Sequence, residues 1–377
     1  MVDRTFFFAG GGTGGHIYPG VAVADKIVEL QPTARIRFLC SSRPIDSQIL
    51  GRAGYEYTAL PAEGFSVRPG KLLAFCRAFY ESCKIAAQLI SQSRDATVIG
   101  VGGFVSGPVC WAAHRLGAPL KLLNVDVLPG RANKLAARWA DEVFVQFDET
   151  ADSFAGAKTR VNVVGCPLRG AFGNPQPQKA IEKLGLSGEK KILLVTGASS
   201  GSASINTTIC MLLERFSTFA ADWQIVHLTG QHQLKKVRRA YSSAKIENMV
   251  VDYFDDMGDL LAATDLAVGR SGAVSVAEYA AAAVPSICMP YPHHRDMHQY
   301  LNAGKLVESG AAIIVDDLPD DEERAEWLWE ELQELMTDEA KRLEMKRCCQ
   351  AIARKDAAGR IARELLQKPA KTGEYDA

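Results

Sequence analysis

The sequence predicts an α/β fold of two doubly wound parallel sheets facing a cleft, and three observations support this. The chain has 377 residues, enough for two domains of ordinary size. Short apolar runs alternate with longer helical patterns, which favours parallel strands covered by helices on both faces. A proline-rich segment at residues 173–178 interrupts the alternation near the middle of the chain, and the alternation starts again after it.

The first half contains six predicted strands, and the opening one runs over residues 5–9 into a glycine turn. A helix is expected to begin near Pro19, because proline is tolerated in a first helical turn. It places Val21, Ala24, Ile27 and Val28 on one face. The other strands are predicted at residues 35–40, 97–101, 120–123, 142–145 and 161–164.

The second half repeats the same plan without an obvious repeat of sequence. Its strands are predicted at residues 191–196, 224–228, 249–252, 266–268 and 286–289. The tail over residues 320–368 is rich in Glu, Lys, Arg and Ala, which favours helices with solvated charged faces. Ligands of doubly wound sheets bind beyond the carboxyl ends of the strands, so we expect each half to contribute a ligand surface to the cleft.

Charge and cysteine content exclude several classes of protein. The 43 basic and 44 acidic residues nearly cancel, so we expect no nucleic-acid partner. Nine cysteines without a CxxC pair indicate reduced thiols in the cytoplasm instead of a disulfide framework or a zinc site. No stretch approaches the roughly 18 consecutive apolar residues of a membrane span, and the apolar start is too short for a signal sequence.

The first glycine turn, residues 10–15, follows a strand and precedes a helix. Backbone N–H groups in such a turn can approach a phosphate at the helix N-terminus. Gly10, Gly12 and Gly15 also fit the dinucleotide pattern GxGxxG. The second strand ends without the acidic residue that would hold a ribose hydroxyl, but Arg43 leaves an NADP site open as an alternative. His16 follows the glycines, where the helix dipole favours a neutral imidazole that can act as a general base; the alternative is a capping or packing histidine.

Three further strand-to-helix turns carry glycine or hydroxyl residues. Residues 100–108 form a glycine-dense turn that predicts either tight packing or close approach of a bulky acceptor. Residues 197–202 supply backbone and hydroxyl donors suited to a diphosphate, or form a plain turn. Residues 270–278 end with Glu278 about one and a half turns into a helix, where a carboxylate can accept hydrogen bonds from two ribose hydroxyls or simply stabilise the helix dipole.

The loop over residues 290–302 contains His294 and His298, four residues apart, but lacks the HExxH arrangement. Gln299 and Asn302 are better suited to hydrogen bonding with sugar hydroxyls. The chain also has no DxD pair, so we predict no metal site and no cofactor, and expect helix dipoles and arginine to stabilise a leaving diphosphate.

The segment over residues 64–75 continues into a helix containing Arg77 and Lys84. Exposed Leu72, Leu73 and Phe75 beside Arg68, Lys71 and Arg77 would suit shallow contact with an anionic bilayer surface. A core-facing helix with solvated basic residues is an equally good interpretation.

Taken in order, five motifs resemble the MurG family of peptidoglycan glycosyltransferases: GGGTGGHIYPG, VGGFVSGP, VGCPLR, GRSGAVSVAE and PYPHHRDMHQYLNA. The resemblance covers nearly the whole chain. It implies the GT-B fold of two Rossmann-like domains, with an acceptor- and membrane-facing domain over residues 1–168, a linker over 169–180 and a UDP-sugar domain over 181–350. The helix over 351–377 is then expected to pack back on the first domain.

The resemblance also implies an activity. The family moves N-acetylglucosamine from UDP-N-acetylglucosamine to undecaprenyl-linked muramoyl-pentapeptide, without a metal and with inversion, at the inner face of the cytoplasmic membrane. His16 is then the expected base, and Asp126 a second candidate that also contacts the sugar. The resemblance places the substrate-binding residues at Thr13, Gly14, Gly15, Arg169, Ser199, Phe254, Ala273, Val274, Ser275, Val276, Ala277, Glu278 and Gln299.

Two segments depart from the family pattern. Where the family has HEQN, this chain has Leu123-Asn124-Val125-Asp126, so Asp126 stands in place of a sugar-contacting asparagine and Asn124 in place of a glutamate. The second glycine turn is GASSGS where GGSQGA is typical. Two alternatives follow within the transferase and binding classes: a transferase with another lipid or natural-product acceptor, and a protein that binds UDP without turnover. An NADP-dependent oxidoreductase is the alternative of another class.

Overall fold

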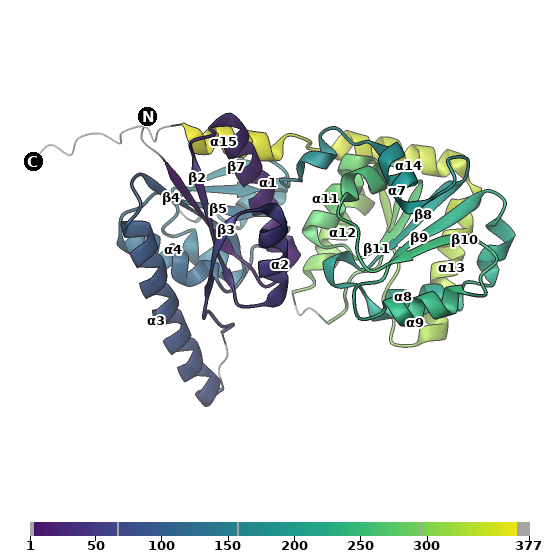
Figure 1. Cartoon of the computed structure of the whole chain (residues 1–377), viewed down its shortest axis with the longest axis horizontal. Coiled ribbons are helices and arrows are strands. Elements are labelled where there is room, and N and C mark those ends of the chain that lie inside the picture. Colours follow the sequence, from purple (N-terminus) through teal and green to yellow (C-terminus); the bar gives the residue numbers. More distant parts are fainter. Residues whose placement is uncertain (1–3, 66–67, 157, 294–295, 368–377) are drawn as a thin grey trace, which may run out of the picture. The chain divides into compact units, whose positions relative to one another are not determined.

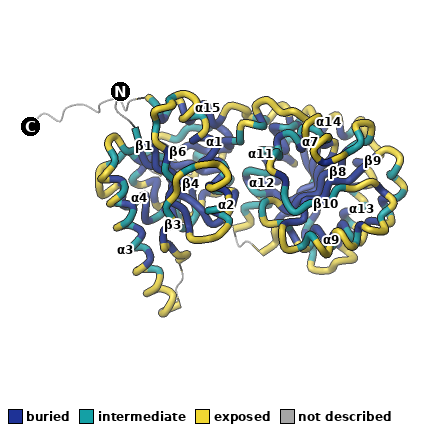
Figure 2. Tube along the Cα trace, viewed as in Figure 1, coloured by how far each residue is buried: buried dark blue, intermediate teal, exposed yellow. Residues whose placement is uncertain are grey.

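The computed structural model describes residues 4–65, 68–156, 158–293 and 296–367 (Figure 1). Its contacts divide the chain into two compact units. The first contains the chain up to Val125, Pro129–Leu168 and the chain from Asp356 onward. The second contains Asp126–Leu128 and Arg169–Lys355. In each unit the inner strands of the sheet are buried, and the helices around them are more exposed (Figure 2).

The first unit is built on a seven-stranded sheet in the order β3-β2-β1-β4-β5-β6-β7, with every neighbouring pair parallel. Phe6, Phe7 and Phe8 of β1, an inner strand, have no exposed surface, as expected for a strand covered on both faces. The strands are β1 (Thr5–Gly10), β2 (Arg35–Ser41), β3 (Glu56–Leu60), β4 (Ala96–Gly102), β5 (Leu120–Asn124), β6 (Glu142–Val145) and β7 (Arg160–Val163).

Among the described residues, seven helices accompany this sheet, and the last comes from the C-terminal end of the chain. It packs against the first helix (Figure 1), and Arg4 donates a hydrogen bond to the carbonyl of Leu366 at its end. The helices are α1 (Gly14–Leu30), α2 (Pro44–Ala53), α3 (Pro69–Ser91), α4 (Ser106–Arg115), α5 (Arg131–Ala136), α6 (Asp148–Asp152) and α15 (Ala357–Leu366).

The first helix begins five residues earlier than the sequence indicated. The expected start near Pro19 was wrong: α1 begins at Gly14 after the extended residue Thr13, and Pro19 lies in its second turn. Threonine is a common N-cap residue, but two glycines are poor helix formers, so the proline was the stronger local signal. Because of this shift, His16 lies in the first turn of the helix.

The second unit has a six-stranded parallel sheet in the order β10-β9-β8-β11-β12-β13. Its strands are β8 (Lys191–Thr196), β9 (Trp223–Leu228), β10 (Glu247–Val251), β11 (Leu266–Gly269), β12 (Ser286–Cys288) and β13 (Ala312–Ile314). Its helices are α7 (Pro177–Leu184), α8 (Ala203–Met211), α9 (Leu234–Tyr241), α10 (Met257–Ala262), α11 (Ala273–Ala282), α12 (His298–Glu308), α13 (Asp321–Thr337) and α14 (Glu339–Ile352), with short 3₁₀ turns η1 (Gly170–Phe172), η2 (Ala198–Ser200) and η3 (Arg215–Phe219).

The predicted α/β class is confirmed, and two strands were missed. β3 is an edge strand on which most side chains are at least partly exposed, so it lacks the apolar run by which the other strands were found. β13 has only three residues. The segment expected as a linker contains η1 and the start of α7 at Pro177, and Arg169 onward clusters with the second unit.

Candidate functional site

All four glycine- or hydroxyl-rich turns follow strands at the point where strand order reverses. In the first sheet this point lies between β1 and β4, and in the second between β8 and β11. The turns follow these four strands, at the carboxyl edge where doubly wound sheets bind their ligands. Topology therefore gathers the predicted turns in pairs, one pair in each unit.

In the first unit, the two turns enclose the imidazole of His16. The hydroxyl of Thr13 lies 3.2 Å from its Nδ1. Gly102 and Gly103, at φ 108° and 77°, pack against the ring: a Cβ added at Gly102 would lie 2.9 Å from His16 Cδ2. If Nδ1 donates its proton to Thr13 Oγ1, the imidazole is the tautomer in which Nε2 carries the lone pair that a general base requires.

The glycines of the first turn do not all face a ligand. The N–H of Gly12 donates to the carboxylate of Asp46, and its carbonyl accepts from Arg43 Nη1 at 2.9 Å. Thr13 and Gly15 are exposed, whereas Gly11 and Gly12 are buried. Of the turn predicted to bind a phosphate, only the residues after Gly12 can therefore offer backbone N–H groups to it. Arg43 is held on the turn and over the ring of Phe104, which weakens the case for an NADP phosphate there.

Asn133 is a residue of this region that the sequence analysis missed. Its side chain is 4% exposed, and its Nδ2 donates to the carbonyl of Leu123 and to Asn124 Oδ1. Its Oδ1 is buried and accepts no hydrogen bond within the described parts of the chain. An asparagine two residues into a short helix carries no local signal of function, because its environment is set by β4 and β5.

In the second unit, the turn after β8 folds tightly on itself. A Cβ at Gly197 would lie 2.1 Å from the backbone N of Ser202, and one at Gly201 would lie 2.3 Å from the carbonyl oxygen of Thr229. Ala198, which replaces the second glycine of the family pattern, has φ 59°. The hydroxyl of Ser199 forms no hydrogen bond with any described residue, so it remains available as a donor.

Glu278 is the most strongly perturbed acidic group at the site. Its side chain is 14% exposed, and its nearest charged partner is Arg169, with Nη2 4.0 Å from Oε1. Burial raises the pKa of Glu278 to about 7, and Arg169 opposes this rise only in part. No described residue donates a hydrogen bond to this carboxylate. A largely buried carboxylate that accepts no hydrogen bond from a described residue, on the helix that follows β11, is suited to ligand hydroxyl groups.

Arg270 connects the loops that follow four strands, a role that the sequence analysis missed. Its Nη2 donates to Ser202 Oγ at 2.8 Å and to Asp317 Oδ2 at 2.7 Å. Its Nη1 donates to the carbonyls of Met289 and Pro290. Arg270 is 7% exposed, so this network is sheltered from solvent and fixes the carboxyl edge of the sheet.

Gln299 and Asn302 differ in what they can offer to a sugar. Gln299 Oε1 accepts a hydrogen bond from the N–H of Tyr291, which leaves the Nε2 amino group to donate to a ligand. Asn302 has no exposed surface; its Oδ1 accepts from the N–H of Val127 and its Nδ2 donates to Asp126 Oδ1 at 2.9 Å. The expectation that Asn302 binds a sugar was wrong, because its amide is used within the protein.

Two other predicted residues are held by neighbouring groups. Arg169 Nη1 donates to the carbonyl of Asp255 at 3.1 Å, which fixes its guanidinium beside Glu278. Phe254 is 6% exposed and lies beneath the ammonium group of Lys183, so little of its ring is open to a base. Ala273 to Ala277 form the first turns of α11, in which the N–H of Val276 donates to the carbonyl of Gly272.

The described residues contain no group of three or more His, Cys, Asp or Glu side chains that could hold a metal ion. His294 lies outside the described residues. His298 instead pairs with Asp296.

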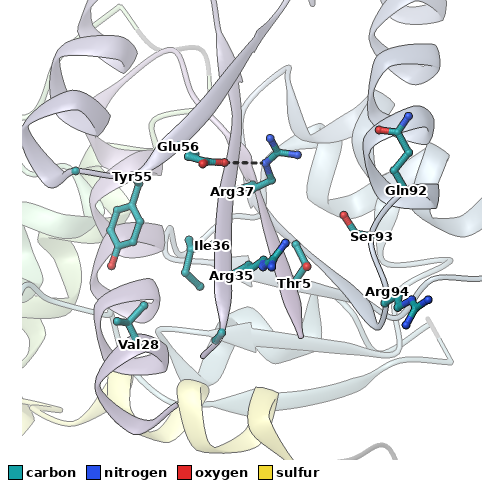
Figure 3. A pocket seen from close by; sticks show the side chains of 12 residues that line it. Thr5, Val28, Arg35, Ile36, Arg37, Tyr55, Glu56, Gln92, Ser93 and Arg94 are labelled. Atoms are coloured by element: carbon teal, nitrogen blue, oxygen red, sulfur yellow. Dashed lines mark hydrogen bonds and ion pairs between the residues drawn. The ribbon is translucent and has the colours of Figure 1, made fainter. Parts of the chain in front are cut away.

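A hollow of about 1110 Å³ in the first unit lies away from these turns (Figure 3). It is lined at the amino ends of β1, β2 and β3, with Arg35 and Arg94 among its side chains and an ion pair between Arg37 and Glu56. Since ligands of doubly wound sheets bind at the opposite edge, we do not include it in the candidate site.

The segment predicted to meet a membrane is exposed on α3 and just before it (Figure 2). Leu73 is 75% exposed, and Phe65, Leu72 and Tyr80 are also exposed. Phe75 is half-buried, with its ring against Phe65 and Phe79. Arg68, Lys71, Arg77 and Lys84 are exposed nearby in sequence. No helix in the described part of the chain is long and apolar enough to cross a bilayer.

Comparison with known proteins identifies the family. Residues 6–145 match the glycosyltransferase family 28 N-terminal domain, and residues 192–361 match its C-terminal domain. The UDP-N-acetylglucosamine–N-acetylmuramyl-(pentapeptide) pyrophosphoryl-undecaprenol N-acetylglucosamine transferase of Desulfitobacterium hafniense (strain Y51) is 33% identical, covering 95% of this chain and 97% of its own length. The chain belongs to the MurG family of glycosyltransferases.

A second relative and a solved structure agree with this assignment. The enzyme of the same name from Myxococcus xanthus (strain DK1622) is 32% identical, covering 94% of this chain and 90% of its own. The crystal structure of Acinetobacter baumannii MurG superposes with a TM-score of 0.71 at 23% identity, covering 96% of this chain and 99% of that one, and confirms the GT-B fold. The chain is therefore a hexosyltransferase by family.

Proposed function

We propose that this enzyme transfers N-acetylglucosamine from UDP-N-acetylglucosamine to undecaprenyl-linked muramoyl-pentapeptide, as a peripheral protein on the inner face of the cytoplasmic membrane. The observation that carries the proposal is the similarity of nearly the whole chain to transferases named for that reaction. Glu278 supports it, because a partly open carboxylate without donors is suited to the ribose of a nucleotide.

In the proposed reaction, an acceptor hydroxyl attacks the anomeric carbon of the donor sugar. The bond from that carbon to the diphosphate oxygen breaks, and UDP leaves with the electron pair. His16 takes the hydroxyl proton on Nε2, with Thr13 Oγ1 holding the other ring nitrogen. His16 lies in the first turn of α1, and the step requires its imidazole in the neutral form.

The second unit is proposed to hold the donor. Glu278 accepts from the ribose hydroxyls, and Gln299 donates its free amino group to the sugar. Ser199, Arg169 and the N-terminus of α11 stabilise the charge that develops on the diphosphate, together with the backbone of Ala273, Val274, Ser275, Val276 and Ala277. Thr13, Gly14 and Gly15 of the first unit contact the donor, and Phe254 lies beside the base.

Asp126 keeps a second candidate function open, namely transfer to another lipid or natural-product acceptor. Its Oδ1 already accepts from Asn302, and an ionised carboxylate offers no donor where the family asparagine offers two. Asn124, which stands in place of the family glutamate, is buried and accepts a hydrogen bond from Asn133 Nδ2. The two functions are distinguished by measuring which UDP-sugar and which lipid acceptor the enzyme uses when several are supplied in competition.

The role of His16 is tested with His16→Ala in the full chain. We expect kcat for acceptor-dependent UDP release to fall by about 10²–10⁴-fold, the usual contribution of a general base, while the dissociation constant for UDP changes less than threefold. Tyr18→Phe, two residues along the same helix, is the control. A folded His16→Ala protein with nearly full turnover contradicts the assignment.

A further inference from the structure

The carboxylate of Asp46 lies beneath the first glycine turn and has no exposed surface. It accepts hydrogen bonds from the N–H of Gly12 at 2.9 and 3.0 Å, from the N–H of Ser41 at 2.9 Å and from the hydroxyl of Ser41 at 2.5 Å. Three donor groups thus converge on one acidic side chain. Asp46 is the third residue of α2, where the helix dipole favours a negative charge.

The backbone of the turn is fitted closely around this carboxylate. A Cβ added at Gly11 would lie 2.2 Å from Asp46 Oδ2, so a side chain at that position has no space. Gly12 has φ 91°, and its carbonyl is held from the other side by Arg43. Both peptide groups of Gly12 are therefore fixed by charged side chains, and neither is left for a phosphate.

The constraint extends from the turn to the imidazole of His16. A Cβ at Gly103 would lie 2.7 Å from the carbonyl oxygen of Gly11 and 3.4 Å from His16 Nδ1, so Gly103 lies between the turn and the ring. Phe104 lies against Gly12 and beneath Arg43. Displacing Gly11 and Gly12 would therefore move the wall against which His16 packs.

We infer that Asp46 is a positioning residue of the transferase: it fixes the glycine turn so that Thr13, Gly15 and His16 are presented to the substrates. The inference rests on the proposed function. A carboxylate suits this position because it only accepts hydrogen bonds, and three donors face it. Burying such a charge is unfavourable unless hydrogen bonds compensate, and the donors and the dipole of α2 provide that compensation.

The test compares two isosteric substitutions of buried carboxylates in the first unit. Asp46→Asn places an amino group against the N–H groups of Gly12 and Ser41. Glu142→Gln alters a carboxylate at the amino end of β6 that pairs with Lys121 and Arg160, at the opposite edge of the sheet. For each full-length variant we would measure kcat for acceptor-dependent UDP release, the dissociation constant for UDP by calorimetry, and the thermal midpoint.

For Asp46→Asn we expect kcat to fall at least about tenfold, in line with loss of a hydrogen bond to a charged group, with UDP affinity within twofold of wild type. Glu142→Gln should keep kcat within twofold even where its thermal midpoint falls. Amide hydrogen exchange at Gly12 should be at least tenfold faster in Asp46→Asn. Ser41→Ala removes one donor to Asp46 and keeps the charge, so it should lower kcat about threefold. If Asp46→Asn does not fold, the kcat of Ser41→Ala tests the inference in its place.

A folded Asp46→Asn protein with kcat within twofold of wild type overturns the inference. So does an equal loss of kcat in Glu142→Gln, or a loss of UDP affinity in Asp46→Asn that matches its loss of turnover, since both indicate general destabilisation. If the wild-type protein releases no UDP in the presence of acceptor, the proposed function fails instead, and hydrogen exchange at Gly12 still tests the contact.

Discussion

Glu278→Gln should stabilise the protein while it removes the proposed ribose contact. In the folded chain burial raises the pKa of Glu278 from 4.5 to about 7. Above pH 7 the carboxylate is charged in both the folded and the unfolded chain. The free energy of unfolding is then lowered by an amount that corresponds to the whole pKa shift. One pKa unit corresponds to about 1.4 kcal/mol, so the penalty is about 3 kcal/mol at pH 8.

The sign follows from proton binding. Between pH 4.5 and 7 the folded state binds more protons at this group than the unfolded state, so the free energy of unfolding falls as the pH rises. Below pH 4.5 the carboxyl group is neutral in both states and the penalty is absent. Glutamine stays neutral throughout, so we expect Glu278→Gln to be more stable than wild type by about 1 kcal/mol at pH 5 and about 3 kcal/mol at pH 8.

Urea unfolding at pH 5 and pH 8, without nucleotide, measures this difference. Glu330→Gln is the matched control, because Glu330 is an exposed carboxylate on α13 of the same unit; we expect its effect to be small and the same at both pH values. Glu278→Gln should also raise the KM for the donor at least tenfold, as expected when a charged hydrogen-bonding group is lost. A variant no more stable than wild type at pH 8, or a difference that does not change with pH, would refute the reasoning.

Three further predictions address the turns and the surface. Ala198→Gly should raise the free energy of unfolding by about 0.5–1 kcal/mol in urea, because glycine relieves the positive φ; a destabilised variant contradicts this. Arg270→Met should lower it by about 1.5–3 kcal/mol, because Asp317 loses its nearest buried cation but keeps Arg324, whose Nε lies 3.6 Å from Oδ1; a change below 1 kcal/mol would show that the network is not stabilising. Leu73→Glu should weaken binding to vesicles containing anionic lipid about tenfold or more, whereas Leu343→Glu on α14 should not; equal effects would argue against membrane contact through α3.

The fold was largely predictable because buried parallel strands produce apolar runs that need no knowledge of distant residues. β1 and β8 were found in this way. β3 was not, because an edge strand with exposed side chains lacks that signal. The start of α1 was misplaced because Gly14 and Gly15 weaken the local helical pattern.

The turns of the site were predictable for a similar reason. Glycines directly after a strand indicate that the backbone there lies close to another group, and this signal is local in the sequence. The residues that fix those turns were not predictable. Asp46 and Gly12 are 34 residues apart in the sequence, and Arg270 and Asp317 are 47 apart. A local sequence pattern does not indicate that residues so far apart form a hydrogen bond. Asn302 shows the reverse error, since its sequence context favoured a sugar contact although the folded chain buries it against Val127.

We propose above that this chain uses UDP-N-acetylglucosamine to glycosylate a lipid-linked muramoyl-pentapeptide. The most direct measurement supplies purified protein with that donor and a short-chain analogue of that acceptor, and follows UDP release together with formation of the disaccharide. We predict UDP release that depends on the acceptor and matches the disaccharide in amount. The absence of acceptor-dependent UDP, while another UDP-sugar or another lipid supports turnover, would contradict the claim.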